Sequence, residues 1–384
     1  MKVLDLYSGM GGLSLGFALA LKNVEIFGID IDRDAVETYN MNLNRFGAKA
    51  IRADALKWEP KDDFDLVIGG VPCQPWSYAN SHSKDKRGEK HSLAQTLPRF
   101  FDLVAKIKPK AFLMENVEGL ATRYRNVLER ELAKVVGNYN TTYAVLNSAD
   151  YGVPQRRRRL FVFGIRKDLR IRPSLPLPTH SADGTALAKW ITTREAIGDL
   201  LSIPPANAVF LTAEQLETMR KRGKPIAHHL CKTEAPIPLD RSNLRTVTST
   251  HITTPANNWN SDWATRVIPL DMPSYTIVEK HRSGQFVETP YGYRKLSVRE
   301  TMRLQSFPDW YVFPPSVSIS KMYRLVGDAV PPILAYKLAR HIGRLFGLDI
   351  KAPKYEDWQL PYFDKAFWFE LSRDSGQPSQ TPSV

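Results

Sequence analysis

A cysteine in a rigid turn is the residue of this sequence best placed to do chemistry. Cys73 lies between glycines and prolines in the stretch GGVPCQPWS (69–77), directly after the apolar run 64–68. Ligands of α/β folds bind in the crevice at the carboxyl ends of such strands. A lone cysteine is more often a small buried apolar residue, but this turn favours a nucleophile. Because the pKa of a free thiol is near ~8.5, a nearby cation would have to stabilise the thiolate at neutral pH.

A glycine-rich turn and two acidic residues near the N-terminus are typical of a nucleotide site. The glycines of 9–12 let the backbone approach a ligand where a helix begins. Asp30 ends the second apolar run, 21 residues after Gly9, where an acidic side chain can accept hydrogen bonds from both ribose hydroxyls. Asp54 could meet an adenine amino group. Asp32 is either a second ribose ligand or only a helix cap, and both interpretations stay open.

Four consecutive arginines lie at the edge of a predicted strand. Residues 156–159 directly precede the apolar run 160–164. Alternate positions of a strand share one face, so Gln155, Arg157 and Arg159 would point together, away from the arginines between them. A basic run is commonly a solvated surface, and that interpretation stays open beside one in which the arginines border a cleft.

These residues lie at the ends of alternating strand and helix patterns. Short apolar runs predict strands, and stretches with helical spacing predict the helices between them. The alternation is typical of a largely parallel, Rossmann-like α/β sheet with helices on both faces. The predicted strands are 3–6, 24–29, 64–68, 111–114, 143–146 and 160–164, and the helices are 13–21, 33–44 and 93–106.

Composition divides the chain into four predicted segments. Residues 166–290 hold 12 of the 27 prolines and predict a smaller, loop-rich domain. Ser297 and Glu300 form a capping box that opens a helix before Pro308. The segments are 1–165, the α/β domain; 166–290, the loop-rich domain; 291–350, which completes the α/β domain; and 351–384, an extension whose last ~12 residues are Ser/Pro/Gln-rich and expected to be disordered.

The charge distribution indicates a polyanionic partner. The net charge is +13, from 53 basic and 40 acidic residues, yet residues 1–100 carry 13 of each. The excess therefore lies beyond residue 100, and a strong basic excess is typical of proteins that bind polyanions.

Membrane, secretory and metal-binding classes are not indicated. No apolar run approaches the ~18–20 residues of a membrane span, and the N-terminus begins at once as a strand, without a signal peptide. Cys73 and Cys231 are 158 positions apart, so neither a disulfide scaffold nor a cysteine-rich zinc site is expected. His228 and His229 are adjacent rather than spaced for a metal. A reducing cytosol is the natural compartment.

Six motifs resemble those of the cytosine-C5 DNA methyltransferase family of bacterial restriction–modification type, and they occur in the family's order. They span about residues 3–340, which leaves little room for chance. The segment 166–290 matches only at PSYTI (273–277), as expected for the family's variable target-recognition domain. The motifs are DLYSGMGG (5–12), PCQPWS (72–77), ENV (115–117), QRRRR (155–159), RKLSVRETMRLQSFPD (294–309) and GDAVPP (327–332).

The resemblance implies an enzyme that transfers a methyl group from S-adenosylmethionine to C5 of a cytosine in a specific double-stranded DNA sequence, releasing S-adenosylhomocysteine. Cys73 would add to C6 and make C5 electron-rich. Glu115 would hold N3 and the exocyclic amine, which calls for a raised carboxyl pKa. Asn116 would orient the loop bearing Cys73, while Arg157 and Arg159 would face the site. The target base must be flipped out, at a cost of about a few kcal/mol.

The resemblance also implies binding residues. The family's last motif usually has Asn after Gly, whereas Asp328 here can accept but not donate a hydrogen bond near the methionine moiety. The polar stretch 78–91 suits a lid over the flipped base, or a disordered surface loop. The implied cofactor residues are Tyr7, Ser8, Gly9, Gly11, Gly12, Asp30, Ile31, Asp54, Pro72, Asp328 and Ala329. The implied DNA-binding residues are Ser77, Lys84, Arg87, Gln155, Arg241 and Arg245.

Two other functions compete with this one. Relatives that modify tRNA carry a Cys-Phe-Thr element, whereas the nearest element here is Cys231-Lys232-Thr233 and the recognition region is long. A catalytically inactive binding module should lose Cys73, Glu115 or the glycine loop, and all three are present. We therefore expect a monomeric modification enzyme that acts on double-stranded DNA of the bacterial nucleoid in the cytoplasm, without a metal or a membrane.

Overall fold

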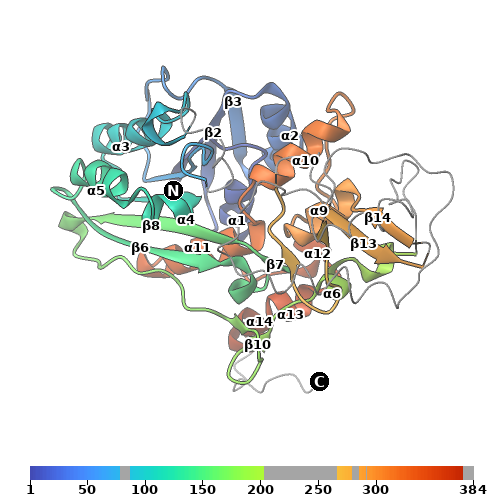
Figure 1. Ribbon diagram of the computed structural model, residues 1–384. Helices are drawn as coiled ribbons and strands as arrows, with labels where there is room; N and C mark the ends of the chain where they lie inside the picture. Colours follow the sequence, from blue (N-terminus) through green and yellow to red (C-terminus); the bar gives the residue numbers. More distant parts are fainter. Residues whose placement is uncertain (78–86, 203–265, 279–284, 291, 375–384) are drawn as a thin grey trace.

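The predicted α/β sheet forms the centre of the structure (Figure 1). The computed structural model describes residues 1–77, 87–202, 266–278, 285–290 and 292–374. The strand order is β3-β2-β1-β4-β5-β8-β6. The first five strands are parallel, and β8 and β6 are antiparallel to their neighbours, which confirms a largely parallel sheet. The strands are β1 (Lys2–Leu6), β2 (Glu25–Asp30), β3 (Ala48–Arg52), β4 (Leu66–Gly70), β5 (Ala111–Val117), β6 (Tyr139–Asn147) and β8 (Arg158–Arg166).

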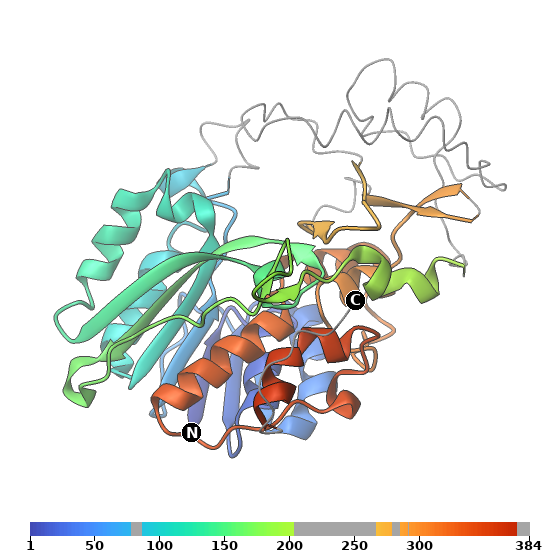
Figure 2. The ribbon, with the colours of Figure 1, turned by 90° about the horizontal axis from the view of Figure 1, so that it is seen from below.

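Helices cover both faces of this sheet (Figure 2). Successive side chains of a strand point to opposite faces, so Val3 and Leu4 belong to different apolar cores. The core of Val3 includes residues of α1, α2 and α11, and that of Leu4 includes residues of α3 and α5. These helices are α1 (Gly12–Ala20), α2 (Arg33–Leu43), α3 (Thr96–Ile107), α4 (Glu118–Ala121), α5 (Arg125–Ala133) and α11 (Pro332–Leu345).

The C-terminal part of the chain returns to the α/β sheet. The Ser297 hydroxyl accepts from the Glu300 N–H, and the Glu300 carboxylate accepts from the Ser297 N–H at 2.7 Å, so the predicted capping box opens α9 (Val298–Leu304). Next come α10 (Ile319–Asp328) and then α11, which packs against α1. The extension is helical where described: α12 (Tyr355–Trp358), α13 (Phe363–Ala366) and α14 (Trp368–Asp374).

The tail predicted to be disordered overlaps the last helix of the structure. Residues 372–374 lie in the last turn of α14, where Ser372 donates to the Trp368 carbonyl at 2.8 Å. The packing of this helix against the body of the protein outweighs its polar composition. The rest of the tail, 375–384, lies outside the described residues.

Within 166–290, the described residues form short elements. The pair β12–β7 links this segment to the arginine motif, because Ser274 and Tyr275 pair with Gln155 and Arg156. Residues 203–265 lie outside the described part, so a separate domain over 166–290 stays a prediction. The remaining elements are η1 (Asn44–Phe46), η4 (Gly88–Lys90), η5 (Ser148–Tyr151), β7 (Gln155–Arg156), η6 (Lys167–Leu169), β9 (His180–Ser181), β10 (Ala188–Lys189), α6 (Thr193–Ile197), η7 (Gly198–Leu200), β11 (Arg266–Val267), β12 (Ser274–Tyr275), β13 (Gln285–Thr289) and β14 (Gly292–Lys295).

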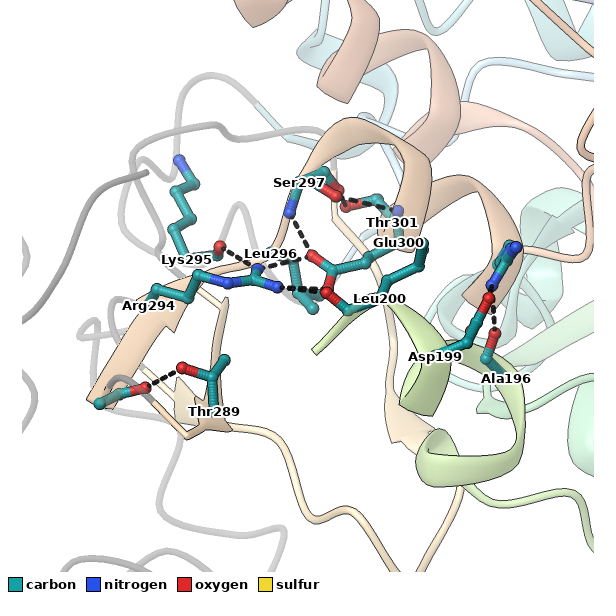
Figure 3. A network of polar contacts seen from close by, with 12 residues as sticks. Ala196, Asp199, Leu200, Thr289, Arg294, Lys295, Leu296, Ser297, Glu300 and Thr301 are labelled. Carbon is teal, nitrogen blue, oxygen red and sulfur yellow. Dashed lines mark hydrogen bonds and ion pairs between the residues drawn. The ribbon is translucent and has the colours of Figure 1, made fainter. Parts of the chain in front are cut away.

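A buried ion pair joins β14 to the start of α9 (Figure 3). The Arg294 guanidinium donates to both Glu300 oxygens at 2.7 and 2.8 Å, and each side chain is only 1% exposed. The same guanidinium donates to the Leu200 carbonyl at 3.3 Å. Arg303 donates to both carboxylate oxygens of Asp199 at 2.6 and 2.8 Å. These contacts fix β14 and α9 against η7.

Replacing Arg294 with methionine is expected to lower the free energy of unfolding by about 3–5 kcal/mol, because Glu300 is left as a buried charge without its partner. Urea-induced unfolding measures this change. The double variant Arg294→Met/Glu300→Gln removes both charges, keeps the capping-box acceptor for the Ser297 N–H, and should recover most of the lost stability. A single variant as stable as the unaltered protein would contradict this account of the pair.

Candidate active site

Three neighbouring strands bring the predicted catalytic residues together. The Cys73 loop begins where β4 ends, and β4 is parallel to β5 with Gly70 opposite Glu115. The antiparallel strand β8 places Arg159 opposite Val117, two residues beyond Glu115. Because the relevant strand ends meet at one edge of the sheet, the thiol, the carboxylate and the guanidinium lie close enough for their charges to interact. This is the edge where α/β folds bind ligands in a crevice.

Glu115 and Arg159 form an ion pair at this edge of the sheet. Arg159 Nε lies 3.1 Å from Glu115 Oε1, and the two side chains are 15% and 8% exposed. Burial raises the pKa of Glu115 above its ordinary value, and the charges of Arg159 and Arg157 oppose that shift. Glu115 is therefore a carboxyl group that can hold a proton at a higher pH than a solvated glutamate.

The Cys73 thiol is protonated at neutral pH in this structure. Burial raises the pKa of Cys73 to about 12, Arg159 and Arg157 lower it, and Glu115 and Asp328 raise it. The sequence suggested that the arginines could stabilise a thiolate, but the desolvation of the charge outweighs them here. The side chain is nevertheless only half-buried, so a reactant can approach the sulfur.

Asn116 ties the cysteine loop to β5. It is fully buried, and its amide Nδ2 donates to the Val71 carbonyl at 3.2 Å. Its Oδ1 accepts from the Val117 N–H at 2.8 Å, which holds the side chain in this orientation. The loop is also closed by a hydrogen bond from the Trp76 N–H to the Cys73 carbonyl at 3.0 Å.

The arginine motif divides into buried and exposed side chains. Arg157 is 2% exposed, and its guanidinium donates to the carbonyls of Ile277 and Gly327, both at 2.9 Å. Arg158 is 60% exposed and pairs with Glu118 at 2.9 Å. The alternation predicted from the sequence is therefore present, although β7 ends at Arg156 and β8 begins at Arg158. Arg157 joins the 277 region to α10 through backbone carbonyls.

Gln155 does not lie where DNA could reach it. Its side chain is fully buried; it donates to the Leu304 carbonyl at 3.2 Å and to the Gln305 side chain, and it accepts from the Ile277 N–H at 2.9 Å. The implied DNA contact is therefore corrected to an internal one. Gln305 in turn donates to the Ala329 carbonyl at 2.6 Å, a role that no local sequence pattern indicated.

Asp30 organises the nucleotide end of the sheet. Its two carboxylate oxygens accept from the N–H groups of Gly9 and Asp32, both at 2.8 Å, and burial raises its pKa. Asp32 caps α2 by accepting from the N–H groups of residues 34 and 35, and it also pairs with Lys321 of α10. The structure thus shows Asp32 as a helix cap, one of the two interpretations that the sequence left open. Ile31 between them is 63% exposed and available to a ligand.

The glycine loop packs closely against the backbone of the last motif. Gly11 has φ +89°, and a Cβ on Gly12 would lie 2.1 Å from the Val330 carbonyl oxygen, so a side chain there would collide with the backbone of the last motif. Tyr7 has φ +58° and donates to the Thr96 carbonyl at 3.1 Å. The Ser8 hydroxyl is buried and has no hydrogen-bond partner among the described residues.

The remaining implied residues lie at the rim. Asp328 is exposed at the end of α10, 3.7 Å from Arg324 Nε, and its charge acts on Cys73 and Arg157. Pro72 is half-buried in the cysteine loop and Ala329 is half-buried after α10. Ser77 and Arg87 border residues 78–86, a segment that contains Lys84. This segment, Arg241 and Arg245 lie outside the described part of the chain.

The described residues offer neither a cluster of metal ligands nor a helix long and apolar enough to cross a membrane.

Comparison with known proteins assigns this arrangement to a family. The sequence model of C-5 cytosine-specific DNA methylases matches residues 1–344. The Type II methyltransferase M.MthTI of Methanothermobacter thermautotrophicus is 34% identical over 356 residues, which cover 89% of this chain and 97% of that one. M.FnuDI of Fusobacterium nucleatum, also a Type II methyltransferase, is 31% identical over 374 residues, covering 95% and 100%.

The fold agrees with this assignment. The crystal structure of the S. pombe Dnmt2 methyltransferase superposes with a TM-score of 0.59 at 19% identity, covering 90% of this chain and 98% of the other. At that identity the likeness concerns the fold alone, and it confirms the Rossmann-like sheet. Together with the sequence matches, it shows that the chain belongs to the C-5 cytosine-specific DNA methylase family, the family and enzyme class predicted from the motifs.

Proposed function

We propose that this protein methylates C5 of a flipped-out cytosine in a specific double-stranded DNA sequence, as the modification enzyme of a restriction–modification system. The observation that carries the proposal is the convergence of Cys73, Glu115 and Arg159 at one edge of the sheet, with Arg159 paired to Glu115 at 3.1 Å. The type II relatives support the assignment to restriction–modification.

Cys73 and Glu115 act together on the pyrimidine ring. Cys73 Sγ forms a bond to C6, and the electron pair of the C5–C6 double bond moves to C5. Glu115 delivers its proton to N3, which accepts the charge that this attack places on the ring. The raised pKa of Glu115 supports that role, because burial lets the carboxyl hold its proton to a higher pH than a solvated glutamate does. Arg159 holds the carboxyl and bears the opposite charge.

Cys73 loses its thiol proton to water when the base is bound. Its thiol has a pKa of about 12 in this structure, and a positively charged, N3-protonated ring would favour the thiolate as it attacks. After C5 has taken the methyl group, a base removes the C5 proton and the Sγ–C6 bond breaks, so Cys73 leaves with the electron pair of that bond. The proton on N3 returns to Glu115, and the departing thiolate takes up a proton from water, so both groups are restored for another turnover.

The glycine loop and the acidic residues fit S-adenosylmethionine. When bound, this cofactor supplies an electrophilic methyl group and departs as S-adenosylhomocysteine. The buried, unpartnered Ser8 hydroxyl and the open space beside Gly9, where an added Cβ would meet no atom within 4 Å, match a ligand packed against the backbone. Asp30 would accept hydrogen bonds from the ribose hydroxyls, Ile31 would contact the adenine face, and Asp54 would accept from the adenine amino group.

A base stacked in a duplex cannot reach these groups, because Cys73 is half-buried and the Glu115 side chain is 8% exposed. We propose that the base is flipped out, at about a few kcal/mol. Ser77, Lys84 and Arg87 are proposed to contact DNA beside the flipped base, and Arg241 and Arg245 to read the target within a recognition domain at 166–290. The enzyme is proposed to act as a monomer.

Methylation of mixed-sequence duplex DNA, followed by base-resolution mapping of 5-methylcytosine, tests the function. We expect methylation at one short sequence only. A parallel reaction with tRNA tests the RNA alternative. Methylation of tRNA alone would refute the DNA substrate, and an absence of 5-methylcytosine from both would favour an inactive binding module.

A further inference from the structure

The loop after β3, residues 53–59, carries Asp54. Hydrogen bonds within the loop fix only part of its shape. Its first residue donates to the Asp30 carbonyl at 2.9 Å. Asp54 accepts from the Leu56 N–H through Oδ1 at 3.0 Å, and its carbonyl accepts from the N–H groups of residues 57 and 58. These bonds form a turn around Asp54, but they do not attach the far side of the loop to the sheet or to a helix.

Arg99 of α3 supplies that attachment. Its Nε donates to the Ala55 carbonyl at 3.1 Å, and its Nη2 donates to the Trp58 carbonyl at 2.5 Å and to Glu59 Oε1 at 2.9 Å. The Arg99 side chain is 18% exposed, so little water competes for these acceptors. A planar guanidinium presents its donors in a rigid arrangement. It therefore holds the carbonyls of Ala55 and Trp58 at a set separation.

This attachment lies beside the nucleotide end of the crevice. Tyr7 of the glycine loop donates to the carbonyl of Thr96, one turn before Arg99 on the same helix. Burial raises the pKa of the Tyr7 hydroxyl, with Arg99 and Asp54 acting on it in opposite directions. Tyr7, Asp54 and Arg99 thus lie close together. Since α3 bonds to the glycine loop through Thr96 and to the 53–59 loop through Arg99, it sets the distance between the two loops.

We propose that Arg99 is a positioning residue for adenine recognition: it holds the 53–59 loop so that Asp54 faces the amino group of the cofactor's base. The inference rests on the proposed function, because it assumes that this end of the crevice binds S-adenosylmethionine. It predicts a particular selectivity. Hypoxanthine has a carbonyl where adenine has the amino group, and a correctly placed carboxylate attracts the amine but repels the carbonyl.

The test compares the affinities of S-adenosylhomocysteine and S-inosylhomocysteine, measured by isothermal titration calorimetry without DNA. In the variant Arg99→Met, the preference for the adenine form should fall about 10-fold, as expected when one charge-assisted contact is misplaced. The matched control is Lys106→Met, which removes the other cation that pairs with Glu59 but makes no bond to the loop backbone. It should keep the preference.

A variant cycle separates positioning from general destabilisation. In an Asp54→Asn background the preference is already reduced, and Arg99→Met should reduce it no further. If Arg99→Met does not fold, as judged by thermal unfolding, Arg99→Lys keeps the charge but cannot hold two carbonyls at once and should show the same loss. An unchanged preference in either Arg99 variant, or an equal loss in Lys106→Met, would overturn the inference alone. Failure of the unaltered protein to bind S-adenosylhomocysteine would overturn the proposed function as well.

Discussion

Replacing Cys73 with alanine is expected to reduce methyl transfer by at least about 10⁴-fold, as is typical when the nucleophile of a covalent mechanism is removed. Without the sulfur no bond to C6 can form, and C5 stays too electron-poor to accept a methyl group. The fold should survive, because Cys73 is half-buried in a loop that Asn116 anchors through the Val71 carbonyl. Single-turnover transfer of a labelled methyl group measures the loss.

The second cysteine of the chain offers the matched control. Cys231→Ala should keep normal turnover, since the mechanism requires a single thiol. A trapping reaction adds independent evidence: with 5-fluorocytosine in the target, C5 has no proton to lose after methylation, so the Sγ–C6 bond persists. Unaltered protein should form a denaturation-resistant DNA complex and Cys73→Ala should not. Normal turnover in Cys73→Ala would refute the covalent mechanism.

Glu115→Gln is the substitution with the second largest expected effect. The amide keeps the shape of the carboxyl but cannot deliver a proton to N3, so the methyl-transfer rate should fall about 10²- to 10⁴-fold, while DNA binding persists. Glu118→Gln is the matched control, because Glu118 pairs with the exposed Arg158 outside the crevice. It should leave the rate within about 2-fold of normal, as expected for a surface ion pair.

The pH dependence of the Glu115 variant gives a separate readout. Burial raises the pKa of Glu115, so the protonated carboxyl is present below that raised pKa and is lost as the pH rises through it. In the unaltered protein kcat/KM should therefore decrease on the alkaline side of this pKa. Glu115→Gln should lack that decrease. An identical alkaline limb in both proteins would show that Glu115 is not the proton donor.

Much of the site follows from local sequence. A parallel α/β sheet collects the ends of neighbouring strands at one edge, so the apolar runs before Cys73 and Glu115 already indicated that the two residues would meet. The capping box at Ser297 and the helix cap at Asp32 could also be predicted, since both depend on hydrogen bonds within three residues.

The contacts made by buried polar side chains could not be predicted in this way. Gln155 meets Gln305 across 150 positions, and Arg157 meets the Gly327 carbonyl across 170. Alternation in a strand predicts which face a side chain occupies, but not whether solvent, DNA or another segment covers that face. For this reason the sequence suggested a DNA contact for Gln155, whereas the structure encloses it between Ile277 and the end of α9.

The sequence by itself determined the family, the order of the elements and the identities of the thiol and the carboxyl group. Only the tertiary structure decided the direction in which their pKa values shift. The pKa of Cys73 depends on how much water the folded chain removes from around the sulfur, and that desolvation exceeds the opposing charges of Arg159 and Arg157. The same applies to Arg99, whose bonds to the carbonyls of Ala55 and Trp58 exist only once α3 packs beside the loop after β3. Local patterns encode which groups are available, and the fold sets their distances and solvation.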